Sequence, residues 1–517
     1  CITTCCGPRP PSAVSETPRM LAPDFGQTYH VRGVISLPYA EIKEPFEAWV
    51  DMKRGRSRID YYYGQVSTFQ LALEKPSGIS YKITPVTTET ELNVMKCFQV
   101  NGTQEDPILP QGALPLTAAF QYVRTEYFEG VLCEVWQNVS EAEFKRNTYT
   151  LWVTRPEGGA SVAAPVHYEM IGYNTLLGSH YDKYLLDYSD FRTSVQDKDF
   201  NRPDGLSCGP FPGPGVEHRL LANPMQDLLH TAPVGHAHRL FGHFKQQFGL
   251  GGGPGQDCEK NRAGLSYSLS LNHLADRSAA EVAVLRGSRT GTPNRGRPFP
   301  AELRSVSPPD SLDWRLYGAV TPVKDQAVCG SCWSFATTGA LEGALFLKTG
   351  MLQVLSEQML VDCTWGFGNN GCDGGEEWRA YEWLIKHGGI ATTDQYGDYR
   401  GMNGFCHNND STATARVTSY TNVTSGDTEA LKVAIDAAHR SFTFYSHGVY
   451  YEPACKNTPD DLDHAVLAVG YGVLDGQSYW LIKNSWSSYW GNAGFVLMSM
   501  KDNNCGVTTD ATYVTLA

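Results

Sequence analysis

The stretch Gln326–Ala336, QAVCGSCWSFA, decides how the chain is interpreted, because it holds two cysteines three residues apart. Cys329 and Cys332 could form a redox pair, supply half of a metal site, or be one disulfide-bonded cysteine beside one nucleophile. A zinc site would need a second tight pair, and the other cysteines are scattered. The choice among these alternatives depends on the residues that accompany the stretch.

The residues that follow predict a helix. Apolar side chains recur at helical spacing from Ser331 onward, and Gly350 is typical of a helix end. Cys332 is therefore expected at a helix N-terminus, where free backbone N–H groups and the helix dipole favour a thiolate. Redox motifs also begin helices, so this position alone does not decide between a redox pair and a nucleophile.

A histidine and an asparagine further along the chain favour the nucleophile. His464 begins the apolar segment LDHAVLAVGYG, and Asn484 ends another in YWLIKNSWSSYWG. They follow Cys332 at about the 130 and 150 residues that separate these three residue types in papain-type peptidases. From Asp310 to Ala517 the chain resembles the papain-like cysteine peptidases. The resemblance implies a multidomain chain that ends in a helical left domain and a β-barrel-like right domain.

The resemblance assigns a role to each motif residue. The Cys332 thiolate is expected to attack the peptide carbonyl, and His464 to take up the thiol proton and protonate the leaving amine. Asn484 would hold the ring of His464, and Trp486 would shield that contact from water. The Gln326 side-chain amide and the Cys332 backbone N–H are the expected donors to the oxyanion.

The resemblance also implies three disulfides and a substrate cleft. The implied pairs leave Cys332 as the unbonded cysteine of this region, and they are Cys329–Cys372, Cys363–Cys406 and Cys455–Cys505. The expected substrate-binding residues are Gly375 on a glycine-rich wall, Glu376, Ala434, Asp463, Ala465, Trp486 and Asp510. We hypothesise that Asp510, with Glu376, lets the second pocket accept Arg or Lys beside apolar side chains. The alternative is that Asp510 faces solvent.

Composition changes divide the chain into four parts. Residues 1–20 are expected to be a disordered leader or a fragment scar, and 21–225 an antiparallel β-rich domain. Residues 226–306 are expected to be an inhibitory propeptide and linker, and 307–517 the peptidase. The alternative for the β-rich region is a disordered arm, which its aromatic content disfavours. Cys97 and Cys133 are the expected disulfide partners there.

The upstream regions resemble known pro-parts. PYAEIKEPFEAWVD and GYNTLLGSHYDKYLLDY are similar to the extension of arthropod 26/29 kDa-type proteinases. LFGHFKQQFG and YSLSLNHLADRSAAEV resemble the family's propeptide, whose chain runs through the cleft in reverse until it is cut, here near Ser307. A glycine-rich segment at 250–261 replaces the usual long helix, and about ten residues before Val433 are missing relative to the family's pattern. Skipped coding segments or real divergence would explain both gaps.

Composition bounds the compartment and the partners. The net charge of -13 over 517 residues argues against a nucleic-acid partner. The 14 cysteines favour a secretory route to the lysosome or outside the cell. Four N-x-S/T sequons, at Asn101, Asn138, Asn409 and Asn422, favour the same route. No apolar run is long enough for a membrane span, and no secretory signal is visible at the start of the sequence.

The sequence therefore predicts a cysteine endopeptidase made as a zymogen, without cofactor or metal. Its expected partners are protein or peptide substrates, its own propeptide as inhibitor, and the N-terminal domain retained as a second chain. One alternative is an exopeptidase whose extra domain blocks the cleft. Another is a non-catalytic binding protein on a peptidase fold.

Overall fold

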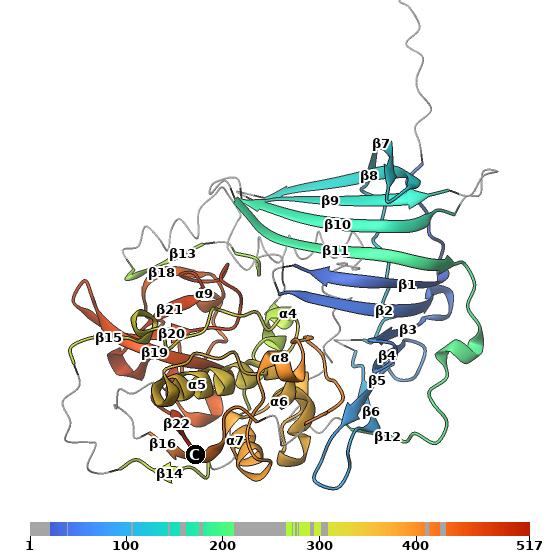
Figure 1. Cartoon of the computed structure of the whole chain (residues 1–517). Coiled ribbons are helices and arrows are strands. Elements are labelled where there is room, and N and C mark those ends of the chain that lie inside the picture. The colour runs from blue at the N-terminus through green and yellow to red at the C-terminus, as the bar shows by residue number, and fades with distance from the viewer. Residues whose placement is uncertain are drawn as a thin grey trace, which may run out of the picture.

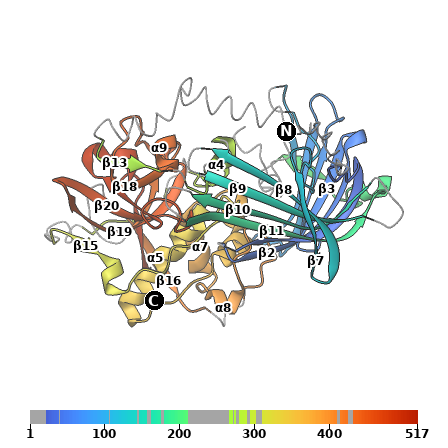
Figure 2. The same cartoon turned by 90° about the horizontal axis from the view of Figure 1, so that it is seen from above.

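A computed structural model gives the fold of the chain. It describes residues 21–38, 40–104, 107–142, 145–155, 162–174, 179–210, 265–270, 272–274, 277, 279–289, 294–300, 309–408, 413–423 and 431–517. Two bodies lie side by side in both views: a large β-sheet from the N-terminal part and an α+β body from the C-terminal part (Figures 1 and 2).

The N-terminal body is a twelve-stranded sheet in the order β12-β6-β5-β4-β3-β2-β1-β11-β10-β9-β8-β7. Neighbouring strands pair antiparallel except β12, which runs parallel to β6. Alternating burial along β2 reflects the period-two placement of its apolar side chains. The strands are β1 Thr28–Leu37, β2 Ile42–Asp51, β3 Arg56–Tyr61, β4 Val66–Leu71, β5 Ile79–Val86, β6 Val94–Asn101, β7 Gln121–Phe128, β8 Val131–Ala142, β9 Lys145–Thr154, β10 Ala164–Asn174, β11 Ser179–Arg192 and β12 Cys208–Pro210.

The disulfide of this sheet differs from the expected one. Cys97 bonds to Cys208, and the predicted Cys97–Cys133 pair is wrong. The reason is the parallel pairing of β12 with β6, which sets Cys208 directly opposite Cys97. Cys133 lies on β8, in the other half of the sheet, and is a buried free thiol.

The C-terminal body combines helices with a ten-stranded sheet in the order β13-β18-β21-β20-β19-β17-β22-β16-β14, with β15 paired to β19. Its helices are α5 Cys332–Thr349, α6 Glu357–Cys363, α7 Glu377–Lys386, α8 Thr393–Tyr396 and α9 Arg440–Thr443. Its strands are β15 Leu312–Asp313, β16 Val417–Asn422, β17 Leu431–Ile435, β18 Tyr445–Tyr450, β19 His464–Leu474, β20 Gln477–Lys483, β21 Phe495–Ser499 and β22 Thr512–Leu516. The upstream segment adds β13 Tyr267–Leu269, α4 Ala279–Val284 and β14 Arg297–Pro298.

Two apolar cores lie within this body. One gathers α5, α6 and α7 and contains Cys332, and the other gathers the β-strands and contains Trp486. Helix α5 ends as the sequence predicts: Gly350 adopts the left-handed conformation, and its N–H bonds to the Phe346 carbonyl at 2.7 Å. Helix α5 packs against β19. Cys332 is the first residue of α5, and His464 is the first residue of β19.

Part of the predicted propeptide is described. Strand β13 pairs antiparallel with β18, and α4 is a short helix of 6 residues. Several expectations lie outside the described residues: the cut near Ser307, the glycine-rich segment 250–261, and the shortened stretch that ends just before β17.

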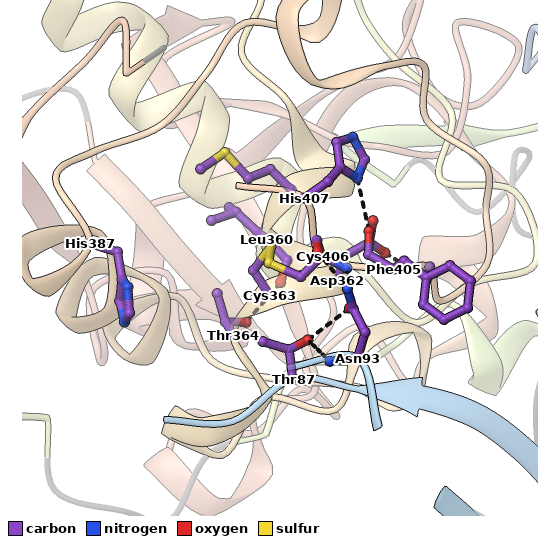
Figure 3. The surroundings of a disulfide bond; sticks show 12 residues. Thr87, Asn93, Leu360, Asp362, Cys363, Thr364, His387, Phe405, Cys406 and His407 are labelled. Atoms are coloured by element: carbon purple, nitrogen blue, oxygen red, sulfur yellow. Dashed lines mark hydrogen bonds between the residues drawn. A yellow bond between two sulfur atoms is a disulfide. The ribbon is translucent and has the colours of Figure 1, made fainter. Parts of the chain in front are cut away.

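The two bodies meet through polar contacts from strand β5 and the loop after it. Lys82 on β5 is fully buried, and its Nζ lies 2.9 Å from an Asp373 carboxylate oxygen. Figure 3 shows Asn93, from the loop between β5 and β6, against Cys406 of the C-terminal body. Its amide nitrogen donates to the Cys406 carbonyl at 2.8 Å, and its oxygen accepts from the Cys406 N–H at 2.7 Å.

Candidate active site

Cys332 is the first residue of α5 and is buried. Burial raises the pKa of its thiol to about 11, although backbone hydrogen bonds from Ala465 and Gly287 act in the opposite direction. The thiol therefore lies beside the start of β19, where His464 is the preceding residue. It is also one of the two free cysteines in the described part of the chain, the other being Cys133.

His464 is held on one side by asparagine and on another by tryptophan. Its Nε2 lies 2.8 Å from the Asn484 Oδ1, which fixes the ring orientation. The Trp486 ring packs against the imidazole, with ring centroids 4.7 Å apart. The Nδ1 atom is buried. Burial lowers the pKa of His464 to about 4, although the hydrogen bonds to Asn484 and to the Leu285 backbone act to raise it.

Gln326 is buried with both ends of its amide engaged. The Nε2 group donates to the carbonyls of Cys329, at 2.7 Å, and Leu285, at 2.9 Å. The Oε1 atom accepts from the Ser485 hydroxyl at 2.6 Å. The sequence interpretation did not assign a role to Ser485, which joins Gln326 to the loop that carries Asn484. The sequence did offer a signal for Ser485, because it lies directly between Asn484 and Trp486.

The segment Leu285–Arg289 lies across this site. The Gly375 N–H donates to the Gly287 carbonyl at 2.9 Å, and the Arg289 N–H donates to the Gly375 carbonyl at 3.1 Å. The Ser288 N–H donates to the Asp463 carbonyl at 3.0 Å, and Ser288 forms a parallel bridge with Gly375. Backbone of Gly287 approaches so closely that an added Cβ would lie 1.8 Å from the Gly330 carbonyl oxygen. The cleft is thus occupied by the chain itself.

This occupation favours the uncharged forms of both key groups. A thiolate–imidazolium pair needs Cys332 deprotonated while His464 is still protonated. Burial raises the pKa of the thiol to about 11 and lowers that of the imidazole to about 4, so the neutral forms of Cys332 and His464 are favoured over a thiolate and an imidazolium.

The predicted substrate-binding residues fall into three groups. Ala434 and Ala465 are buried partners across β17 and β19. Asp463 accepts from the Ala437 N–H at 2.9 Å and pairs with the Arg286 guanidinium at 3.1 Å. Glu376 pairs with Arg379 at 3.3 Å, whereas an Asp510 oxygen accepts from the Asn294 amide at 3.3 Å.

The cysteines of the C-terminal body pair as the resemblance implies. The disulfides are Cys329–Cys372, Cys363–Cys406 and Cys455–Cys505. One cluster of potential metal ligands, Asp436, His439 and Cys455, includes a cysteine already bonded to another sulfur. Because a disulfide sulfur is no thiolate ligand, this cluster does not suit a metal.

Among the four sequons, three lie in described residues. Asn101 is exposed at the end of β6, and Asn138 and Asn422 are half-buried on β8 and β16. Asn409 lies outside the described residues. A search of the described helices finds none with the length and apolar character that a bilayer crossing requires.

Comparisons with known proteins follow the same region. A family model described as papain family cysteine protease matches residues 308–515. Digestive cysteine proteinase 1 of Homarus americanus is 45% identical over 270 residues, which cover 49% of this chain and 82% of that protein. Cathepsin L of Sarcophaga peregrina is 44% identical over 275 residues, covering 49% and 79%. The structure of digestive procathepsin L 3 from Tenebrio molitor larval midgut is 34% identical, covers 55% of this chain and 94% of that chain, and has a TM-score of 0.49.

Proposed function

The chain belongs to the papain family of cysteine proteases, and from this premise we propose that it is the zymogen of an endopeptidase whose nucleophile is Cys332. The observation that carries the proposal is the convergence of Cys332, the His464–Asn484 pair and Gln326 under one covering segment. A redox pair at Cys329 and Cys332 is incompatible with the Cys329–Cys372 bond.

The reaction follows from these groups once the cleft is open. His464 takes the thiol proton at Nδ1, and the Cys332 thiolate attacks the carbonyl carbon of the peptide. The oxyanion receives hydrogen bonds from the Gln326 Nε2 and the Cys332 backbone N–H. His464 then protonates the leaving amine, so the peptide C–N bond breaks and a thioester remains. Water, deprotonated by His464, hydrolyses the thioester and regenerates the thiol.

The covering segment is the inhibitor in this proposal. Leu285 places a carbonyl against the Gln326 amide, and Gly287 lies against the wall at Gly330. Ser288 pairs with Gly375 in the parallel sense, which supports a chain that runs opposite to a substrate in antiparallel pairing. A chain in this direction covers the thiol but does not present a peptide bond for productive attack.

The proposed division of the chain is residues 21–225, 226–306 and 307–517, with residues 1–20 as a disordered leader or a fragment scar. We propose that the N-terminal domain remains as a second chain after processing. The contacts that support this join it directly to the peptidase part: Lys82 with Asp373, and Asn93 with Cys406. Neither contact needs the propeptide.

The second specificity pocket remains the proposed site of selectivity for basic side chains. Ala434 and Ala465 supply small, buried walls. Asp510 is half-buried, and one of its carboxylate oxygens accepts from the amide of Asn294, a residue upstream of the proposed cut. A fluorogenic peptide panel tests this, with Arg or Lys against Leu or Phe at the second position. Equal rates at a pH where Asp510 is ionised would contradict it.

The compartment is proposed to be the secretory pathway, with the enzyme in the lysosome or secreted. Four disulfides among the described residues support an oxidising route. Glycosylation at the sequons remains part of this proposal, and a mobility shift on enzymatic deglycosylation tests it.

Peptide hydrolysis by acid-processed protein tests the function itself. The proposal predicts internal cleavage of an unstructured protein substrate, and its loss in the Cys332→Ala variant. The Cys133→Ala variant removes the other free thiol and serves as the control, because it should retain activity. Cleavage that survives Cys332→Ala would contradict the proposal.

A further inference from the structure

Residues of the covering segment can be assigned to levels of the cleft. Backbone of Gly287 is a hydrogen-bond neighbour of the Cys332 thiol, so Gly287 lies at the level of the scissile residue. Ser288 is opposite Gly375, so it takes the place of the second substrate residue before the scissile bond. Arg289 therefore takes the place of the third residue before that bond. Side chains alternate between faces in an extended chain of either direction, so a substrate's third residue would project to the side that Arg289 takes.

The Arg289 side chain enters a polar pocket at this level. It is 7% exposed, and its guanidinium donates to the Asn370 Oδ1 and to the Asp373 carbonyl oxygen. Burial lowers its pKa to about 10, so it stays cationic at neutral and acidic pH. Asp373 and Glu376 act to raise that pKa, and Arg379 to lower it. The pocket thus offers acceptor oxygens spaced to accept the planar fork of an arginine.

Asp373 links this pocket to the N-terminal domain. Its carbonyl oxygen faces Arg289, while its carboxylate faces the Lys82 ammonium at 2.9 Å. The side chains of Lys82 and Asp373 are 0% and 5% exposed. Removing one partner of a buried ion pair leaves an uncompensated charge, so each fixes the other in place. A residue of the β-sheet therefore determines where the turn carrying Asp373 lies.

We propose that Asn370, Asp373 and Lys82 form a subsite, shared between the two domains, for an arginine side chain three residues before the scissile bond. Asn370 and the Asp373 carbonyl bind the guanidinium, and Lys82 is a positioning residue that acts through Asp373. The inference rests on the proposed function, since the subsite is filled by Arg289 until the segment is removed.

Three peptides that differ at the third position test the subsite in acid-processed protein that retains both domains. They carry Arg, Lys or Ala there, with identical residues elsewhere. The kcat/KM for Arg should exceed that for Ala by about tenfold, the factor that a hydrogen bond to a charged group contributes. Lys should fall between them, because it lacks the two-pronged fork. Equal values for Arg and Ala, with all peptides cleaved, overturn the subsite alone. No cleavage of any peptide overturns the proposed function as well.

Variants separate positioning from general damage. Lys82→Met should lower the Arg-to-Ala ratio at least threefold, and Lys82→Arg, which keeps the cation, should restore it. Asn93→Ala is the matched control: it weakens the domain contact at Cys406 without touching Asp373, so it should keep the ratio. Asn370→Asp should raise the ratio, since a carboxylate then meets the guanidinium, and a folding fault cannot produce that increase. An unchanged ratio in both Lys82→Met and Asn370→Asp overturns the assignment.

Discussion

The Gln326 side-chain amide donates to the Leu285 carbonyl oxygen at a distance of 2.9 Å. Leu285 belongs to the segment upstream of the proposed cut, and Gln326 is the proposed donor to the reaction's oxyanion. The inhibitory segment therefore engages the group that would stabilise the transition state. Both Cys332 and His464 are buried in this arrangement, and burial favours the uncharged thiol and the uncharged imidazole.

Gly287→Ala should open the cleft without any cut. The added Cβ would lie 1.8 Å from the Gly330 carbonyl oxygen, so the segment must move away from the thiol. The unprocessed variant should react with iodoacetamide at Cys332 at least tenfold faster than the unprocessed wild type, by quantitative mass spectrometry. Gly209→Ala is the control, because its Cβ would meet nothing within 4 Å. Equal labelling of all three proteins would contradict the covering role.

Thiol reactivity should depend on pH differently before and after processing. In the closed form the pKa of Cys332 is raised to about 11 and that of His464 is lowered to about 4, so the labelling rate should rise only on the alkaline side. Once water enters, the imidazolium stabilises the thiolate, and a plateau should appear at acidic pH. Labelling rates from pH 4 to 10 measure this. An acidic plateau in the unprocessed chain would contradict the closed, neutral pair.

Gln326→Ala should lower kcat by about 100-fold or more, the usual effect of removing one oxyanion donor. KM should change little, because the amide acts on charge that develops in the transition state. Ser485→Ala should produce a smaller loss of kcat, since the hydroxyl only holds the Gln326 Oε1 at 2.6 Å. Ser485→Thr keeps a hydroxyl and should restore most of it. A change confined to KM would count against this role.

Glu44→Gln should stabilise the two-domain chain at neutral pH. Glu44 lies on β2 and is 2% exposed, and its Oε1 has no hydrogen-bond partner among the described residues. Burial raises its pKa well above the ordinary value. Ionisation therefore costs free energy in the folded chain, about 1.4 kcal/mol for each pKa unit. Protonation removes this cost. The buried carboxyl therefore lowers the free energy of unfolding as the pH rises above about 4.3, the usual glutamate pKa.

Thermal unfolding at pH 4 and pH 7.5 measures that effect. The glutamine variant should unfold at a higher temperature than the wild type at pH 7.5, by a few °C, and at the same temperature at pH 4. Glu47→Gln on the same strand is the matched control with the opposite sign. It removes a carboxylate whose pKa is lowered by Arg32 and His30, although burial acts to raise it, so it should destabilise at pH 7.5. Stabilisation by both variants would contradict the burial argument.

The peptidase half could be predicted closely because its signals are local. Helix α5 and its Gly350 end follow from apolar spacing, and the glycine-rich wall Gly371–Gly375 and the loop Asn484–Trp486 are contiguous motifs. The disulfides there came from resemblance, not from spacing. The Cys97–Cys208 bond could not be predicted, since it depends on β12 returning beside β6 over a separation of 111 residues.

The domain contacts had no signal in the sequence. Nothing in the sequence around Lys82 distinguishes it from a surface lysine, and its partner Asp373 lies in the C-terminal body. Likewise, the local sequence around Leu285 and Gly287 indicates only the end of a short helix. Their importance comes from their contacts with Gln326 and Gly330 in the active site.

The most direct test of the account is identification of the thiol that an epoxide inhibitor captures in acid-processed protein. The account predicts one adduct, on Cys332, with loss of peptide hydrolysis in proportion to labelling. Little adduct is expected in the unprocessed chain, where Leu285 and Gly287 cover the site. An adduct on Cys133 in place of Cys332, or full hydrolysis after complete capture of Cys332, would contradict it.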